Sequence, residues 1–196
     1  LSLLFSLGVL ILTYLIGKQV FDKKIAVVAV FLLALTPTFF FFSKIMLSGI
    51  VSTFFVLLGT YLFLRKSYLF SGLFFGLGFM TRFLQLLMFI IIMAIILIYN
   101  KKNKIKINML IGFLIPVLPY LTLNYFLYSN PLQPFLDQIF LTKNTGWMYL
   151  EPWWFYFVSF FKENFMSIFA LFGIYYLIKS KLTLEKNVVV YLLFLP

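Results

Sequence analysis

The sequence lacks cysteine and histidine altogether, and acidic residues are rare among its 196 residues. Without cysteine the chain can form no disulfide bond and offers no thiolate to a metal ion. Without histidine it lacks the commonest general base and metal ligand. The acidic residues are Asp22, Asp137, Glu151, Glu163 and Glu185. Any acid–base chemistry within this chain must therefore rest on these carboxylates, on lysine or on tyrosine.

Charge of either sign is also scarce. Only 11% of the residues are charged and 64% are hydrophobic, whereas a soluble domain carries about 25% charged residues. So much apolar surface suits a lipid bilayer, whose core of about 30 Å is crossed by a helix of roughly 20 apolar residues. The apolar runs lack the alternating polar positions of barrel strands, so the spans are expected to be helices. The predicted fold class is an all-α, polytopic transmembrane helical bundle.

We predict a single transmembrane domain over residues 1–196, with about eight spans of which the first and last are incomplete. Both ends lie within apolar runs, so we expect a fragment of a longer protein. The predicted spans cover 1–16, 25–43, 45–64, 68–81, 83–99, 108–128 and 164–178, with the start of another after 186. Pro116 and Pro119 are expected to kink or end the sixth span, because proline removes a helix hydrogen bond.

Two glycines in the fourth predicted span, Gly72 and Gly76, have the small-xxx-small spacing that lets membrane helices approach closely. We interpret this pair as a packing site for another helix and assign it no ligand.

The cations gather in every second connection between spans. Loops 17–24, 65–67, 100–107 and 179–186 hold 12 of the 16 lysines and arginines. The positive-inside rule places these loops in the cytoplasm, which predicts a multi-pass protein of the plasma membrane. The net charge of +11 therefore indicates topology, and we expect no nucleic-acid partner. The long connection at 129–163 is then external.

An aromatic cluster lies in this external connection. Its members are Trp147, Tyr149, Trp153, Trp154 and Tyr156. Tryptophan and tyrosine are typical of the membrane–water interface, so the cluster predicts an interfacial segment, either a re-entrant or a surface helix. Stacking against a sugar is the other interpretation that the cluster leaves open.

Lys44, Arg82, Lys143 and Lys162 are the four cations outside these loops, and the positive-inside rule gives no reason for Lys44 and Arg82. Each lies in a tight turn between two apolar runs, and the alternation of spans places both at the external face. One interpretation is that each side chain reaches toward phospholipid headgroups, as long cationic side chains do at little cost. The other is that both turn inward and bind one phosphate, which two cations held at one face can stabilise.

The order of several short motifs resembles a known enzyme family. The motifs are GKQVFDKKIA at 17–26, ALTP at 34–37 followed by Ser43-Lys44, GLFFGLGFMTR at 72–82, and WWFY at 153–156 ahead of Gly173. Together they resemble the multispan, lipid-sugar-dependent glycosyltransferases of the GT-C fold, in particular the protein-mannosyltransferase and aminoarabinose-transferase-like branch. If the chain is a member, it begins at the second span of the family.

The resemblance implies transfer of a sugar from a polyprenyl-phosphate donor to a protein, lipid or polysaccharide acceptor at the external face. The implied reaction is a single, inverting displacement at the anomeric carbon. Lys44 and Arg82 match positions that are basic and lie near the lipid phosphate. The catalytic carboxylate is expected upstream of Leu1. Within the chain Asp137 and Glu151 are the candidates for it, with solvated loop charges as the plainer interpretation of both.

One stretch departs from the family pattern. The family often carries an acidic residue shortly after its Ser-Arg pair, but residues 45–50 read IMLSGI, without a carboxylate. The sequence therefore predicts no metal-binding residue and no defined cofactor, while the resemblance leaves a divalent metal ion open.

Two other classes of membrane protein stay open. A transporter or flippase would need paired ionisable residues inside its spans and internal repeats, and the sequence shows neither. A non-catalytic, lipid-binding membrane subunit fits the missing carboxylate near Gly49.

Overall fold

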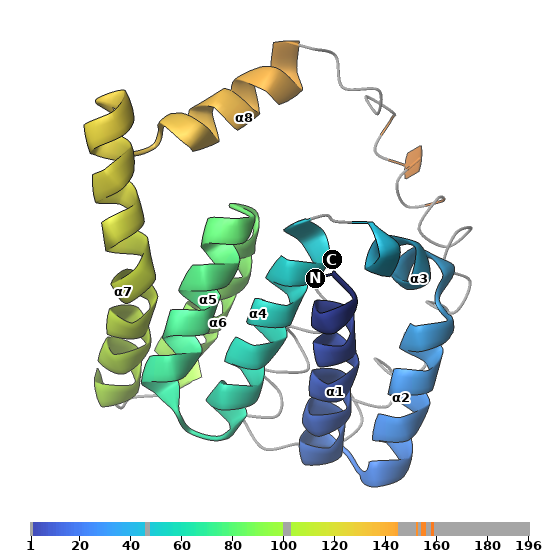
Figure 1. The fold of residues 1–196 in the computed structure, drawn as a ribbon. Helices are drawn as coiled ribbons and strands as arrows, with labels where there is room; N and C mark the ends of the chain where they lie inside the picture. The colour runs from blue at the N-terminus through green and yellow to red at the C-terminus, as the bar shows by residue number, and fades with distance from the viewer. Residues whose placement is uncertain are drawn as a thin grey trace.

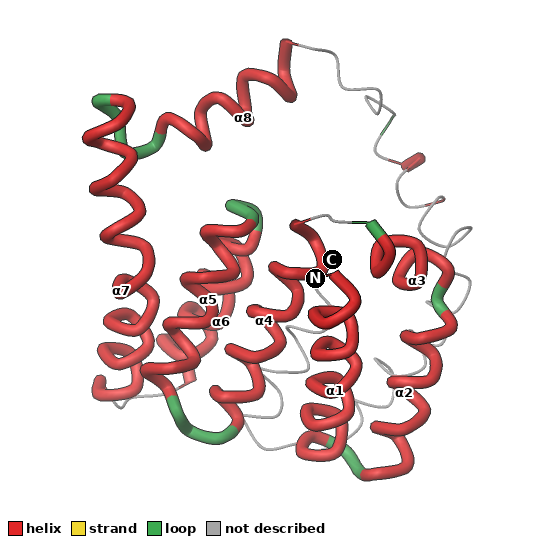
Figure 2. The backbone as a smooth tube through the Cα atoms, viewed as in Figure 1, coloured by secondary structure: helices red, strands yellow, loops and turns green. Residues whose placement is uncertain are grey.

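The computed structural model describes residues 2–45, 48–99 and 103–144, together with residues 152, 154, 155 and 158. The described part of the chain is helical and contains no strand (Figures 1 and 2). Its helices are α1 (Ser2–Val20), α2 (Lys23–Leu35), α3 (Pro37–Lys44), α4 (Ser48–Leu64), α5 (Tyr68–Thr81), α6 (Gln85–Tyr99), α7 (Asn103–Tyr128) and α8 (Gln133–Asn144). The all-α prediction is confirmed, and the spans predicted at 164–178 and after 186 lie outside the described residues.

The span predicted over 25–43 is not one continuous helix. α2 and α3 are separate helices bent by 65° relative to each other. Thr36 between them has an extended backbone, with φ −65° and ψ 120°. Pro37 opens α3, and a proline disfavours the helical conformation in the residue before it. The sequence therefore breaks this span at Thr36 and redirects the chain.

The predicted basic loops at 17–24 and 100–107 are shorter than expected, because helices extend into them. α1 continues to Val20, and α2 begins after Asp22, whose carboxylate accepts the Ile25 backbone N–H at 2.8 Å. α7 already begins at Asn103. Most of the described lysines in these segments therefore lie on helix ends.

α7 also continues through Pro116 and Pro119, so neither proline ends it. Membrane helices tolerate proline where neighbouring groups compensate for the lost hydrogen bond. A Cβ atom at Gly76 of α5 would lie 2.7 Å from Cγ of Pro116, which places the proline ring against that glycine.

The core of the bundle is built around α5, which packs between α4 and α7 (Figure 1). On the side of α5 that faces α7, the backbones of the two helices are in direct contact. A Cβ atom at Gly72 would collide with the carbonyl of Met109, and one at Gly112 with the carbonyl of Leu69. The predicted packing role of Gly72 and Gly76 is confirmed. On the α4 side the buried Ser71 hydroxyl donates to the Gly59 carbonyl at 2.8 Å.

The helices differ in whether they are long enough to cross a bilayer. Among the described residues α1 and α7 are long and apolar enough, and the bent pair of α2 and α3 would make a third span. α5 has 14 residues, about 21 Å of helix against a hydrocarbon core of roughly 30 Å. α4, α5 and the first part of α6 are shorter apolar helices. The chain is thus a membrane protein, but the described residues do not show eight full spans.

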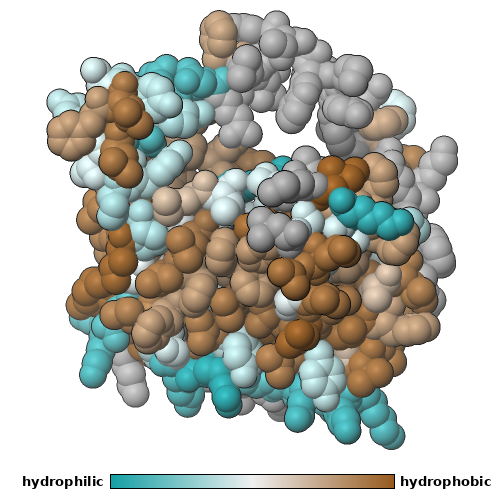
Figure 3. Space-filling model, viewed as in Figure 1, coloured by the Kyte–Doolittle hydropathy of each residue, from teal (hydrophilic) through white to brown (hydrophobic). Residues whose placement is uncertain are grey.

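The described cations lie at two opposite ends of the bundle, with an apolar belt between them (Figure 3). One end carries Lys18, Lys23, Lys24, Arg65, Lys66, Lys104 and Lys106. The opposite end is formed by α3, the α5–α6 turn and α8, and we call it the Arg82 end (Figure 1). This arrangement agrees with the predicted alternation, and the orientation relative to the cytoplasm stays a prediction.

Part of the predicted external connection, 129–163, is helical. It contains α8, whose axis runs across the end of the bundle (Figure 1). Trp154 of the aromatic cluster is 53% exposed. The other members, Trp147, Tyr149, Trp153 and Tyr156, lie outside the described residues.

Candidate functional site

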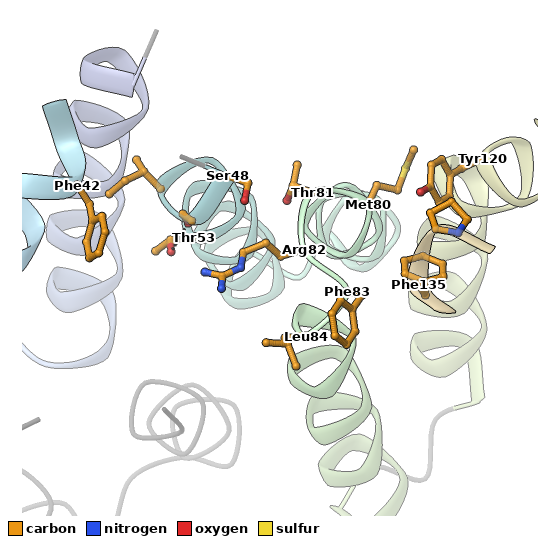
Figure 4. A pocket seen from close by; sticks show the side chains of 13 residues that line it. Phe42, Ser48, Thr53, Met80, Thr81, Arg82, Phe83, Leu84, Tyr120 and Phe135 are labelled. Atoms are coloured by element: carbon orange, nitrogen blue, oxygen red, sulfur yellow. Dashed lines mark hydrogen bonds between the residues drawn. The ribbon is translucent and has the colours of Figure 1, made fainter. Parts of the chain in front are cut away.

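A cavity of about 690 Å³ lies at the Arg82 end of the bundle (Figure 4). Its walls are contributed by α3, α4, α5, the α5–α6 turn, α7 and α8. The lining residues are Phe42, Ser48, Gly49, Ile50, Thr53, Met80, Thr81, Arg82, Phe83, Leu84, Tyr120, Pro134 and Phe135. Among these described residues Arg82 alone carries a charge, and most of the others are apolar or aromatic.

Backbone hydrogen bonds on both sides fix the position of Arg82. Its N–H donates to the Gly78 carbonyl at 3.0 Å and so caps α5, while its own carbonyl accepts the Gln85 N–H at 3.0 Å. Its backbone is extended, with φ −149° and ψ 118°. A cation at a helix C-terminus is favoured by the helix dipole. From this turn the side chain reaches toward α4, near Thr53 (Figure 4).

The guanidinium group of Arg82 meets the first turn of α4. A Cβ atom at Gly49 would lie 3.3 Å from Nη1 of Arg82. Helix N-termini carry a partial positive charge and backbone N–H groups without intrahelical partners. Two sources of positive potential therefore meet beside the hydroxyls of Ser48 and Thr53, and this combination suits an anion.

The two described carboxylates do not neutralise this positive potential. The Asp22 carboxylate caps α2 at the opposite end of the bundle. Asp137 accepts a hydrogen bond from Gln133 within α8. The guanidinium of Arg82 thus has no carboxylate partner among the described residues, which leaves its donors available to a ligand.

Ser52 and Gln85 connect the helices that meet at Arg82. The Gln85 side-chain amide donates to the Ser52 hydroxyl at 3.4 Å, and the Ser52 hydroxyl donates to the Gly49 carbonyl at 2.9 Å. Ser52 is completely buried. The α5–α6 turn is thereby tied to the first turn of α4, so this pair positions Arg82 against Gly49.

Replacing Ser52 with alanine is expected to lower the free energy of unfolding by about 1 kcal/mol, because the Gln85 amide loses a buried acceptor. Thr53→Ala is the matched control. Among the described residues the exposed Thr53 hydroxyl donates to the Gly49 carbonyl of its own helix, so its loss should change stability by less than about 0.5 kcal/mol. Thermal unfolding of the two variants in detergent measures the difference. Equal shifts would contradict a role for Ser52 in joining the helices.

Lys44 lies on the last turn of α3 and is exposed. Its ammonium group sits over the Phe40 ring, 3.9 Å from the ring centroid, in a cation–π contact. Phe42 of the same helix lines the cavity, but Lys44 is not among the lining residues. The structure thus brings Arg82 into the cavity and Lys44 to the Phe40 ring, and a phosphate shared by both cations stays a prediction.

The candidate carboxylates do not line the cavity. Asp137 is exposed on α8, where its Oδ1 accepts from the Gln133 amide at 2.8 Å. Phe135, two residues earlier, faces the cavity, and positions two apart on a helix point in widely different directions. Glu151 lies outside the described residues. In the described part of the chain no group of three or more acidic side chains gathers as a metal site.

The sequence singled out Arg82, which lines the cavity, but not the other polar residues around it. Gln85 had a detectable signal, because it is a polar residue at the start of an otherwise apolar run. Ser52, Thr53 and Tyr120 had none, since hydroxyl-bearing residues are common in membrane helices and no local pattern shows which ones face a cavity.

Comparison with known proteins adds to this geometry. Residues 1–123 match the family model described as dolichyl-phosphate-mannose-protein mannosyltransferase. The chain belongs to this family. No curated protein and no solved structure matches it. Membership makes the chain a membrane glycosyltransferase of the GT-C type, as the sequence motifs indicated.

The family match covers the parts that hold Arg82. It includes α1 to α6 and most of α7, and so contains the whole α4–α5–α6 arrangement around the guanidinium. Pro134 and Phe135, which α8 contributes to the cavity, lie beyond the matched residues.

Proposed function

We propose that this chain forms part of a glycosyltransferase that moves a sugar from a polyprenyl-phosphate donor to a protein, lipid or polysaccharide acceptor at the external membrane face. The observation that carries the proposal is the guanidinium of Arg82, which has no described carboxylate partner and lies at the N-terminus of α4. A family of glycosyltransferases supplies the reaction class, and the cavity supplies a place for the charged part of the donor.

The proposed reaction is a single displacement. An acceptor oxygen attacks the anomeric carbon, the bond from that carbon to the phosphate oxygen breaks, and the electron pair leaves with the lipid phosphate. The configuration at the anomeric carbon inverts. Arg82 and the first turn of α4 stabilise the negative charge that develops on the departing phosphate. The acceptor proton passes to a carboxylate outside the described residues, for which Glu151 is the candidate within this chain.

The rest of the cavity lining suits the lipid part of such a donor. Apolar side chains dominate it, and the exposed Phe42 and Leu84 continue onto the outer surface of the bundle. A polyprenyl chain that moves from the bilayer to this lining exchanges one apolar environment for another, so placing it there costs little. The donor would therefore place its phosphate at Arg82 and its chain along the aromatic and aliphatic wall.

The experiment uses the full-length parent protein in liposomes with radiolabelled polyprenyl-phosphate mannose, because mannose is the sugar in the name of the family. With a protein, lipid or polysaccharide acceptor supplied, we expect the label to move from the polyprenyl phosphate to that acceptor and polyprenyl phosphate to be released, with no change in protein-free liposomes. Label that crosses the bilayer on an intact lipid would support a flippase instead. Binding of the lipid without turnover, for every lipid-linked sugar supplied, would support a non-catalytic lipid-binding subunit.

A further inference from the structure

Helix α8 presents three different sides. Phe135 faces the bundle, where its ring stacks on Phe79 with centroids 5.2 Å apart and meets Tyr120 edge-on at 6.1 Å. Gln133 and Asp137, one helical turn apart, form a polar side joined by a 2.8 Å hydrogen bond. The third side exposes the apolar side chains of Leu136, Ile139 and Phe140, and Lys143, one turn later in the sequence, shares its helical phase.

The apolar side follows the helical period. Leu136, Ile139 and Phe140 are spaced at i, i+3 and i+4, and Leu132 lies four residues before Leu136, in the turn just ahead of the helix. Their side chains are between 48% and 64% exposed. In water such a row would be costly, and no described residue covers it.

The end of α7 that precedes α8 also exposes apolar side chains. Leu123 and Phe126 near the end of α7 are 60% and 82% exposed. They lead into the turn before α8, where Asn124 is buried and its amide donates to the Pro131 carbonyl at 3.3 Å. This hydrogen bond and the Phe135 stack fix α8 on the bundle.

We propose that α8 is an interfacial helix that lies along the membrane surface, with Leu132, Leu136, Ile139 and Phe140 inserted into the lipid. Its 12 residues amount to about 18 Å of helix, too short to cross the roughly 30 Å hydrocarbon core. Its axis runs across the end of the bundle (Figure 1). A helix with one apolar and one polar side binds at the boundary between headgroups and acyl chains.

This position has a consequence for the cavity. Pro134 and Phe135 of α8 contribute to its wall, so the cavity lies at the depth of the lipid headgroups. A ligand with a charged head and an apolar chain can then reach Arg82 from the bilayer side. α8 would hold its place at the interface whatever reaction the cavity supports.

The test uses the fact that residues 1–196 contain no cysteine, so that a single introduced cysteine can be labelled. In a cysteine-free background of the full-length protein, single variants Leu136→Cys, Ile139→Cys and Phe140→Cys carry an environment-sensitive fluorophore in nanodiscs. Gln133→Cys and Asp137→Cys are the matched controls on the polar side of the same helix. Quenching by phosphatidylcholine with brominated acyl chains, and by aqueous iodide, is measured at each position.

We expect brominated lipid to quench the three apolar positions at least ~3-fold more than the two polar positions, and iodide to show the reverse order. Apolar positions shielded from both quenchers would overturn the proposal, because another part of the protein or a second copy would then cover them. Equal quenching by iodide at all five positions would also overturn it, since the apolar side would then face water.

Discussion

Replacing Arg82 with alanine is expected to lower kcat/KM for transfer from a polyprenyl-phosphate sugar by about 100-fold, because a preorganised donor to the departing phosphate is lost. Arg82→Lys should recover part of the rate, since an ammonium keeps the charge but not the two-pronged hydrogen bonding of a guanidinium. Both variants should fold, because the Arg82 side chain is exposed at the surface of the cavity. Initial rates with the full-length protein measure the effect.

Arg65→Ala is the matched control for this prediction. Arg65 is also an exposed arginine that follows a helix, but it lies at the opposite end of the bundle, with its guanidinium 5.7 Å from the Tyr61 ring centroid. Its loss should leave the transfer rate nearly unchanged. A parental rate in Arg82→Ala, or an equal fall in Arg65→Ala, would contradict the proposed phosphate contact. Lys44→Ala then decides whether the second cation shares it, because only a shared phosphate makes that variant slow as well.

Replacing Gly112 with valine is expected to destabilise the bundle by about 3 kcal/mol or more, because the new side chain meets backbone that cannot move alone. A Cβ atom at this position collides with the carbonyl of Leu69 on α5. This clash is relieved only when α5 separates from α7, and that separation would also open the core around Phe75 and Phe113. We expect a melting temperature lower by roughly 10 °C, or no monodisperse protein in detergent.

The control for this variant is Gly78→Ala on α5. A Cβ atom there would lie 3.3 Å from Cγ2 of Val56, a side-chain atom that can shift slightly. Its melting temperature should stay within a few degrees of the parent, about the effect of 1 kcal/mol or less. A tolerated Gly112→Val, with unchanged melting, would show that α5 and α7 do not meet backbone to backbone.

Helix bounds and packing surfaces that depend on a local pattern of residues were predicted most accurately from the sequence. The bounds of α5, Tyr68–Thr81, agree with the prediction, because charge and polarity change sharply at both of its ends. The Gly72 and Gly76 spacing correctly indicated a packing surface, although only the structure shows that the partner is α7. The break at Thr36 was missed because the apolar run continues through it, even though Pro37 carries the local signal for a helix start.

The surroundings of Arg82 could not be predicted, because they depend on how three helices meet. Gly49 and Arg82 are far apart in sequence, and they approach only because α4 packs along α5. The bond between Ser52 and Gln85 depends on the same packing. Asp137 looked like a candidate from its place in the external connection, but the helical phase of α8 turns it away from Phe135 and the cavity.

The closeness of Gly49 to Arg82 also determines how a mutation at position 49 would change the charge of the cavity. A single base change turns any glycine codon into an aspartate or a glutamate codon, so one point mutation at Gly49 would set a carboxylate against the guanidinium. Asparagine at the same position would fill similar space without the charge. The preference of the cavity for an anionic or a neutral headgroup is thus a single substitution away from change, and position 49 is where we expect related chains with different donors to diverge.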